Sequence, residues 1–344
     1  PKKDGTTRML KVPTMADRAW QCLVKYAIEP AHEALFHAKS YGFRPGRSTH
    51  DAQKILFNNL SSHANGINKR ILELDIEKCF DRIDHTSIME RVIAPQAIKL
   101  GLWKCLKAGV GPEFPELRTP QGGVVSPLLA NIALDGIEDL HNSIRYADDM
   151  VLILKSKDDE NKILKDIPEF LATRGLKVSE RKTKLVKATD GFDFLGWHFK
   201  VQTNGKFSCV PSEDNYKAFR QKVKDIVNCS NYGARIKATK LAPLVRGWRN
   251  YHRYCKMDGS RFSLWGTVHR AFKVFNKEKK LNRYTATELI KKAFPAVPYS
   301  KNSHVNVKSN KSPYDGDTVY WSKRNSKLYD GATSKCLKRQ DHSC

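Results

Sequence analysis

Apolar residues in the first half of the chain follow the two-residue period of β-strands in one place and flank an acidic pair in another. Between residues 71 and 76, Leu72, Leu74 and Ile76 fall on one face of a predicted strand, and Asp75 falls on the other. Between residues 144 and 154, two short apolar runs flank the tetrapeptide Tyr-Ala-Asp-Asp. This second pattern predicts a strand, a tight turn and a strand, with acids at the tip.

Other stretches have helical spacing. A helix is expected from Asp17, as its N-cap, to about Pro30, and further helices are expected over 128–133 and 158–171. Aromatic residues alternate around a glycine over 192–199, which predicts a second hairpin.

The character of the chain changes near residue 205. From about residue 215, lysines and arginines recur among apolar residues, which predicts helices with one packed face and one cationic face. From about 293 the chain is rich in Pro, Ser, Asn and Lys, so a loosely ordered linker is expected there.

Charge divides the chain in the same way. The formal net charge is +25, and residues 206–344 hold 30 Lys and Arg against 10 Asp and Glu. A basic surface can serve solubility or an anionic membrane, but no apolar run approaches the roughly 18 residues of a membrane span. We therefore expect a nucleic acid to run across the C-terminal part and no membrane partner.

Length and cysteine content bound the class of protein. The chain has 344 residues and is 40% hydrophobic, so a soluble multidomain protein is expected. Its eight cysteines have no Cys-x-x-Cys spacing, which favours a reducing compartment. The first residues lack an initiator Met, and the sequence reads as a fragment without its true N-terminus.

Three acids are the candidates for catalysis. If the two predicted strand elements pair, Asp75 meets Asp148 and Asp149 at one sheet edge. Carboxylates that lie close together repel unless a hard cation such as Mg²⁺ sits among them, and two such ions can drive phosphoryl transfer. We expect Asp148 to be the direct ligand beside Asp75, with Asp149 assisting. An acidic turn that only aids solubility is the alternative.

Several motifs in order resemble those of reverse transcriptases. They are Asp75 with Phe80, then Pro-Gln-Gly-Gly-Val-Val-Ser-Pro over 120–127, then Tyr-Ala-Asp-Asp over 146–149. More narrowly, nearly the whole chain resembles the reverse transcriptase and maturase encoded by group II introns.

The resemblance implies an α+β right-hand polymerase with an antiparallel sheet plus helices. Fingers and palm would occupy 1–205, a helical thumb or maturase domain 206–292, and a small basic DNA-binding region 293–335. Residues 336–344 resemble the truncated start of an HNH endonuclease domain, which stops before any complete metal motif, so no nuclease activity is assigned.

The resemblance also implies contacts with the incoming nucleotide. Lys2 and Arg8 would hold its triphosphate, and Phe80 would pack under the sugar and exclude a 2′-hydroxyl. Gln121 would contact the nucleotide or template base, and Lys182 the triphosphate or the leaving pyrophosphate. Solvated cations and a core aromatic are the plain alternatives.

A second set of residues is expected to contact template, primer or intron RNA. Arg44 and Arg47 either reach a phosphate backbone or pin neighbouring segments by hydrogen bonds. Gly196 and Trp197 resemble the hairpin that grips the primer end. The cations expected on the thumb are Lys237, Lys240, Arg246, Arg249 and Arg253.

The functional expectation combines two roles. The enzyme would copy RNA into DNA from deoxynucleoside triphosphates with two Mg²⁺ ions, and it would bind group II intron RNA, promote splicing and support insertion into target DNA. One alternative is a domesticated or CRISPR-associated reverse transcriptase. The other is an RNA-binding splicing factor with a vestigial polymerase site.

Overall fold

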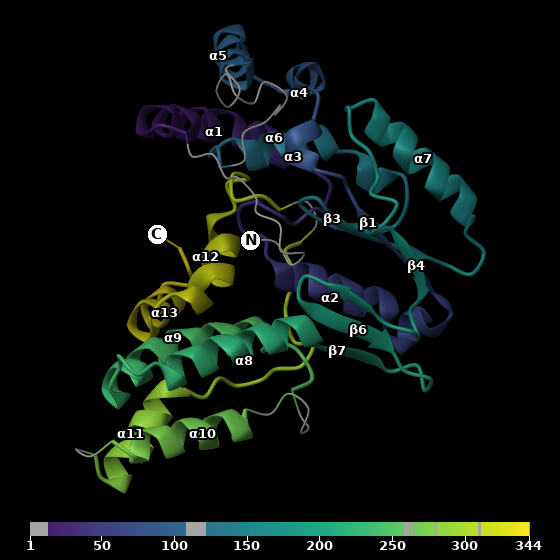
Figure 1. Cartoon of the computed structure of the whole chain (residues 1–344). Helices are drawn as coiled ribbons and strands as arrows, with labels where there is room; N and C mark the ends of the chain where they lie inside the picture. The colour runs from purple at the N-terminus through teal and green to yellow at the C-terminus, as the bar shows by residue number, and fades with distance from the viewer. Residues whose placement is uncertain are drawn as a thin grey trace. The chain divides into compact units, whose positions relative to one another are not determined.

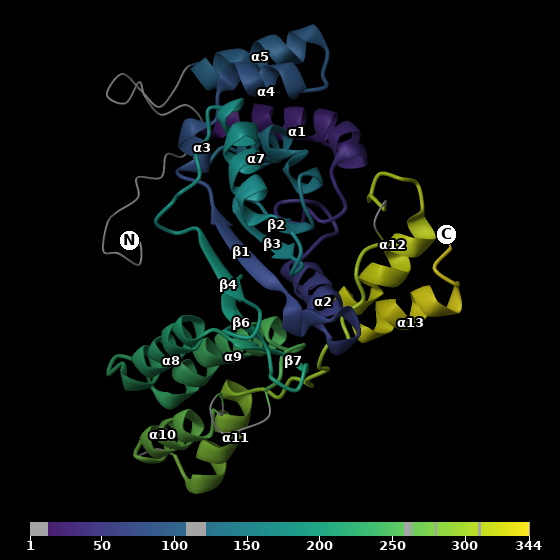
Figure 2. The same ribbon diagram turned by 90° about the vertical axis from the view of Figure 1, so that its right-hand side faces the viewer.

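The computed structural model describes residues 13–107, 122–257, 262, 264–278, 281–308 and 311–343. Lys2, Arg8 and Gln121 lie outside the described residues. The chain forms two compact units, one from residues 1–52, 72–185 and 306–344 and the other from 53–71 and 186–305. Figures 1 and 2 show their elements.

The main sheet of the described residues has four strands in the order β2-β3-β1-β4. Their bounds are Arg70–Asp75 for β1, Ser143–Tyr146 for β2, Asp149–Leu154 for β3 and Lys184–Lys187 for β4. Strands β2 and β3 are antiparallel, with Tyr146 opposite Asp149. Both predicted strand elements are therefore confirmed, and β1 and β3 are neighbours as the site requires.

Helices cover the sheet of the first unit. They are α1 (Met15–Leu35), α2 (Thr49–Leu60, which continues into the second unit), α3 (Cys79–Arg82), α4 (His85–Arg91), α5 (Gln96–Lys107), α6 (Ser126–Leu134) and α7 (Glu160–Ala172). Strand β3 is buried along residues 150–154, so both of its faces are covered. The helices predicted over 128–133 and 158–171 are confirmed.

The boundaries predicted for α1 are wrong at both ends. Its N-cap is Thr14, whose hydroxyl accepts a 3.2 Å hydrogen bond from the Asp17 amide. The helix also continues through Pro30 to Leu35. Pro30 has no backbone N–H to donate, but contacts of His32 and Glu33 with other elements hold this part of the helix.

The second unit combines a small sheet with a helical bundle. The sheet has the order β5-β6-β7, from β5 (Phe192–Phe194), β6 (Trp197–Val201) and β7 (Phe207–Pro211). The helices are α8 (Glu213–Asn228), α9 (Ala234–Tyr251), α10 (Trp265–Asn276) and α11 (Arg283–Ala293). In Figure 1, α8 and α9 run side by side, as their contacts require. The hairpin predicted around Gly196 and the helices predicted beyond 215 are confirmed.

The C-terminal segment folds within the first unit. It contains α12 (Thr318–Asn325), a 3₁₀ turn (Ser326–Leu328) and α13 (Gly331–Arg339). Trp321 is 7% exposed, and its indole N–H donates to the Ser312 carbonyl at 2.8 Å. The loosely ordered linker expected from 293 is therefore wrong for residues 311–343, because a buried tryptophan supplies an anchor there. None of the described helices is both long and apolar enough to cross a membrane.

Candidate active site

The Tyr-Ala-Asp-Asp tetrapeptide forms the turn between β2 and β3. Tyr146 and Asp149 are the last paired residues, so Ala147 and Asp148 form a two-residue turn. Ala147 has φ +59°, a left-handed conformation that costs free energy for a residue with a Cβ. The turn therefore needs support from its surroundings.

The charges of Asp75 and Asp148 act on Asp149 across adjacent strands. Part of Asp149 is open to solvent, yet its surroundings desolvate its carboxyl group. This desolvation and the charges of Asp148 and Asp75 raise the pKa of Asp149 to about 6, whereas Lys182 lowers it. The sheet has therefore concentrated negative charge at one edge, as the sequence predicts.

Lys182 is the cation that meets this charge. Its Nζ lies 3.2 Å from Asp75 Oδ1 and 3.1 Å from Oδ2. The sequence places Lys182 near the triphosphate or pyrophosphate, whereas in the structure it forms an ion pair with Asp75. The ammonium group thus offsets part of the negative charge of the carboxylates.

The donor set suits a hard divalent ion in type and in charge. Asp75, Asp148 and Asp149 offer only carboxylate oxygens, which Mg²⁺ prefers. After desolvation, the charges of Asp148 and Asp75 are the next causes of the raised pKa of Asp149. As the side chains are placed, the described residues contain no group of three or more His, Cys, Asp or Glu able to hold a metal ion. In this arrangement the carboxylate of Asp75 is paired with Lys182.

A buried guanidinium supports the turn from behind. Arg145 on β2 is 0% exposed and pairs with Glu138, which is 3% exposed. Its Nη1 donates to Asn131 Oδ1 at 3.0 Å and to the Ala147 carbonyl at 3.2 Å. Arg145 therefore holds the left-handed residue of the turn directly.

The same network reaches the loop of residues 41–48. The Asn131 side-chain amide donates to the Gly42 carbonyl at 2.9 Å. A Cβ on Gly42 would lie only 2.2 Å from the Ala147 nitrogen, so only glycine permits this approach. Sequence reasoning gave Arg145, Glu138, Asn131 and Gly42 no role. One feature of the sequence could have indicated this network: Arg145 is a charged residue inside an apolar run just before the two acids.

Phe80 is partly buried and packs against the core of the first unit. It lies on the short helix α3, which follows Lys78, a residue with φ +46°. Its partial exposure is compatible with the predicted contact to a sugar and with the core alternative.

Arg44 and Arg47 pin neighbouring segments, which corrects their prediction as template contacts. Both guanidinium side chains are 2% exposed. Arg44 pairs with Glu33 at 2.7 Å and donates to the His37 and Ser40 carbonyls. Arg47 donates to the Ala38 carbonyl at 2.8 Å. Inward-facing guanidinium groups cannot reach a nucleic-acid backbone, so the alternative interpretation applies.

Trp197 belongs to the core of the second unit. It is 0% exposed, stacks on Tyr251 at 4.5 Å and donates its indole N–H to His252 at 3.0 Å. A primer end cannot stack on this ring, so the predicted contact is wrong. Gly196, with φ +77°, forms the turn of the hairpin next to Asn215.

The five cations expected on the thumb divide by exposure. Lys237 is 8% exposed, and Arg249 donates to the Phe294 and Pro295 carbonyls at 3.2 and 2.7 Å. Arg253 is half-buried over the Tyr254 ring. Lys240 and Arg246 are exposed on α9, so of the five cations these two present their charge most openly to solvent.

Comparison with known proteins gives the family. Residues 1–199 match the family model described as reverse transcriptase (RNA-dependent DNA polymerase), and residues 216–287 match the group II intron, maturase-specific domain. The chain is 40% identical over 285 residues to "Maturase-like protein 1" of Euglena gracilis, covering 82% of this chain and 62% of that protein. It is 33% identical over 281 residues to "Group II intron-encoded protein LtrA" of Lactococcus lactis, covering 59% of this chain and 46% of that protein.

Among solved structures, apo telomerase from Candida tropicalis matches with a TM-score of 0.45 and 12% identity, covering 83% of this chain and 55% of that one. The chain spans 62% and 64% of the length of two curated relatives, the "Maturase-like protein 1" of Euglena gracilis and of Euglena longa. The chain belongs to the reverse transcriptase family and carries the maturase-specific domain of group II introns.

Proposed function

We propose that this chain is an RNA-directed DNA polymerase and a group II intron maturase. One observation carries the proposal: Asp75 and the Tyr-Ala-Asp-Asp turn lie on neighbouring strands, and the charges of Asp148 and Asp75 contribute to the raised pKa of Asp149, in a chain of the reverse transcriptase family. An acidic turn that served only solubility would not need an acid on the next strand or a buried arginine behind it.

Asp75 and Asp148 are proposed to bind the metal, with Asp149 assisting. When bound there, two Mg²⁺ ions would activate the 3′-hydroxyl of the primer and stabilise the departing pyrophosphate. Lys182 is released from Asp75 in this proposal and turns to the phosphates of the deoxynucleoside triphosphate. Phe80 lies under the sugar, and Lys2, Arg8 and Gln121 keep the nucleotide contacts that the resemblance implies.

The maturase role rests on the second unit. Lys240 and Arg246 present positive charge on α9, inside the stretch that matches the maturase-specific domain. Contacts between such cations and phosphates give affinity that does not depend on the nucleotide sequence of the RNA. We propose group II intron RNA as the partner here and target DNA as the substrate for insertion, in a bacterial cell or an organelle.

Primer extension on an RNA template, run beside splicing of the RNA that flanks the coding region, tests both roles. Asp75→Ala should lower single-turnover extension by about 1,000-fold, equivalent to about 4 kcal/mol at the transition state. The same variant should bind RNA and assist splicing as the wild type does, because the cations of α9 are untouched.

Asp139→Ala is the matched control. Asp139 is an acid of the same unit, and its side chain is 73% exposed. It should leave extension unchanged. Extension by the wild type without any effect on splicing would favour a domesticated or CRISPR-associated enzyme. Splicing help without extension would favour an RNA-binding splicing factor, and full extension by Asp75→Ala would exclude the proposed site.

A further inference from the structure

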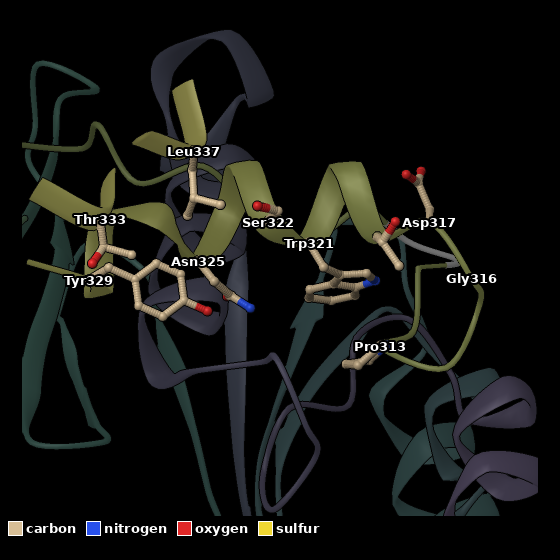
Figure 3. A pocket seen from close by; sticks show the side chains of 10 residues that line it. Pro313, Gly316, Asp317, Trp321, Ser322, Asn325, Tyr329, Thr333 and Leu337 are labelled. Atoms are coloured by element: carbon tan, nitrogen blue, oxygen red, sulfur yellow. The ribbon is translucent and has the colours of Figure 1, made fainter. Parts of the chain in front are cut away.

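A cavity of about 480 Å³ lies beside α12 and α13, and Asp75, Asp148 and Asp149 are not among the residues that line it. Its walls include Trp321 and Asn325 from α12, Tyr329 from the connection, and Thr333 and Leu337 from α13 (Figure 3). This volume falls within the range of small-molecule sites, about 300–1,000 Å³. The polymerase site does not use it.

Two aromatic rings give the cavity its apolar surface. The indole of Trp321 is fixed in the wall by its bond to the Ser312 carbonyl and by contact with Gly46, whose added Cβ would lie 2.5 Å from the ring. Tyr329, by contrast, is 51% exposed. Part of Tyr329 is therefore accessible to a partner at the cavity.

Some polar side chains in the cavity wall are hydrogen-bonded within the chain and others are not. The hydroxyl of Thr333 donates to Asp330 at 2.6 Å, and that of Ser322 is 3.0 Å from His342 Nδ1. The carboxamide of Asn325 has no hydrogen-bond partner in the described part of the chain, and Figure 3 shows it beside Tyr329. It offers a donor and an acceptor together, which is the pair needed to bind the edge of a nucleobase.

The two helices also carry unbalanced positive charge. Lys323, Lys335, Lys338 and Arg339 are exposed and have no acidic partner among the described residues. The acid in the wall, Asp317, is paired with Lys311 at 2.6 Å. Asp330 at the start of α13 accepts from Thr333 and has no cationic partner among the described residues, but the exposed cations outnumber it, so a phosphate chain is attracted to these helices.

We propose that this cavity holds one unpaired nucleobase of a single-stranded nucleic acid. Tyr329 stacks on the base, Asn325 hydrogen-bonds its edge, and Lys335, Lys338 and Arg339 meet the adjoining phosphates. The inference rests on the proposed binding of nucleic acid by this chain, and it is independent of polymerase activity.

The test is fluorescence anisotropy of the whole chain with labelled 12-mers of thymidine and of uridine at fixed salt. Tyr329→Ala should weaken binding about tenfold, the typical worth of one base–aromatic stack. Asn325→Leu should weaken it by a similar factor. Leu328→Ala is the matched control, because Leu328 is 82% exposed next to the cavity and does not line it. The tighter of the two 12-mers identifies the sugar that the site accepts.

An abasic 12-mer separates the base from the phosphates. On it, wild type and Tyr329→Ala should bind equally, and the dependence of affinity on salt should be the same for both. If Tyr329→Ala and Asn325→Leu weaken binding to the normal and the abasic strand by the same factor, the inference is overturned. It is also overturned if neither variant changes the affinity for the normal strand. If the wild type extends primers but binds no 12-mer, the base site is excluded while the proposed polymerase stands.

Discussion

At the residue scale, the shape of the acidic turn depends on one buried guanidinium. Arg145 donates to the carbonyl of Ala147, the residue that takes the left-handed conformation. Its other partners, Glu138 and Asn131, are themselves buried at 3% and 1% exposure. Removing the Arg145 charge is costly, because the buried carboxylate of Glu138 would then have neither a partner nor water to solvate it.

Arg145→Met should therefore lower both stability and extension. Loss of the ion pair should cost about 3–5 kcal/mol of unfolding free energy, because Glu138 is left unpaired. In the double variant with Glu138→Met, the stability should largely return, because apolar residues of similar volume can replace a buried pair. Extension should stay at least about tenfold low, because the Ala147 carbonyl still lacks its donor.

Urea unfolding and single-turnover extension check the two effects separately. Arg82→Met is the matched control, since its ion pair with Glu77 is 35% and 41% exposed and far less costly to lose. A double variant that extends primers at the wild-type rate would show that Arg145 acts on stability alone.

The acids themselves could be predicted because Asp75 ends a strand with a two-residue period and Asp148 and Asp149 lie between two short apolar runs. The supporting network could not. Asn131 and Gly42 are 89 residues apart in sequence, and no local pattern says that a helix and a loop meet behind one turn. The inward direction of the Arg44 and Arg47 side chains could not be predicted for the same reason. It depends on Glu33, which belongs to another element, α1.

At the element scale, α1 shows how tertiary contacts override a local stop signal. Pro30 predicts the end of the helix, yet the last turns bury His32 and Glu33. Nε2 of His32 accepts a 3.0 Å hydrogen bond from the Ile93 amide, and Glu33 pairs with Arg44. These partners lie outside the helix, so its true length is not visible in its own sequence.

His32 makes the packing of α1 dependent on pH. Burial lowers the pKa of His32 from its ordinary 6.5 to about 4. The stabilising contribution of neutral His32 is thus complete above pH 6.5 and is lost as the pH falls toward 4, because the unfolded chain takes up the proton first. We expect a loss of about 2 kcal/mol over this window, after allowance for partial solvent screening.

Urea midpoints of the wild type and His32→Gln at pH 7 and pH 4.5 measure this dependence. Glutamine can still accept from the Ile93 amide but does not titrate, so its midpoint should change less. His63→Gln is the control, since His63 is exposed in a 3₁₀ turn. An identical fall in wild type and His32→Gln would place the acid sensitivity elsewhere.

At the scale of the whole molecule, the C-terminal segment completes the first unit. Asp51, 0% exposed, accepts from Arg324 Nη2 at 2.9 Å and from the Val307 amide at 3.0 Å. Tyr314 donates to Glu29 at 2.7 Å. These contacts span more than 250 residues of sequence, so composition alone suggested a loose linker where the chain is in fact anchored.

This anchoring makes Arg324 a stability determinant of the first unit. Arg324→Ala leaves the buried Asp51 without its guanidinium partner and should lower the unfolding free energy by about 3 kcal/mol. In an Asp51→Asn background the same change should cost about 2 kcal/mol less, because no buried charge is then left unpaired.

Lys323→Ala is the control, because Lys323 is the neighbour of Arg324 on α12 but is exposed. It should change nothing measurable in either background. Urea unfolding of the four combinations gives the coupling. If Arg324→Ala costs the same in both backgrounds, the pair does not hold the C-terminal segment to the unit, and Trp321 is left as its main anchor.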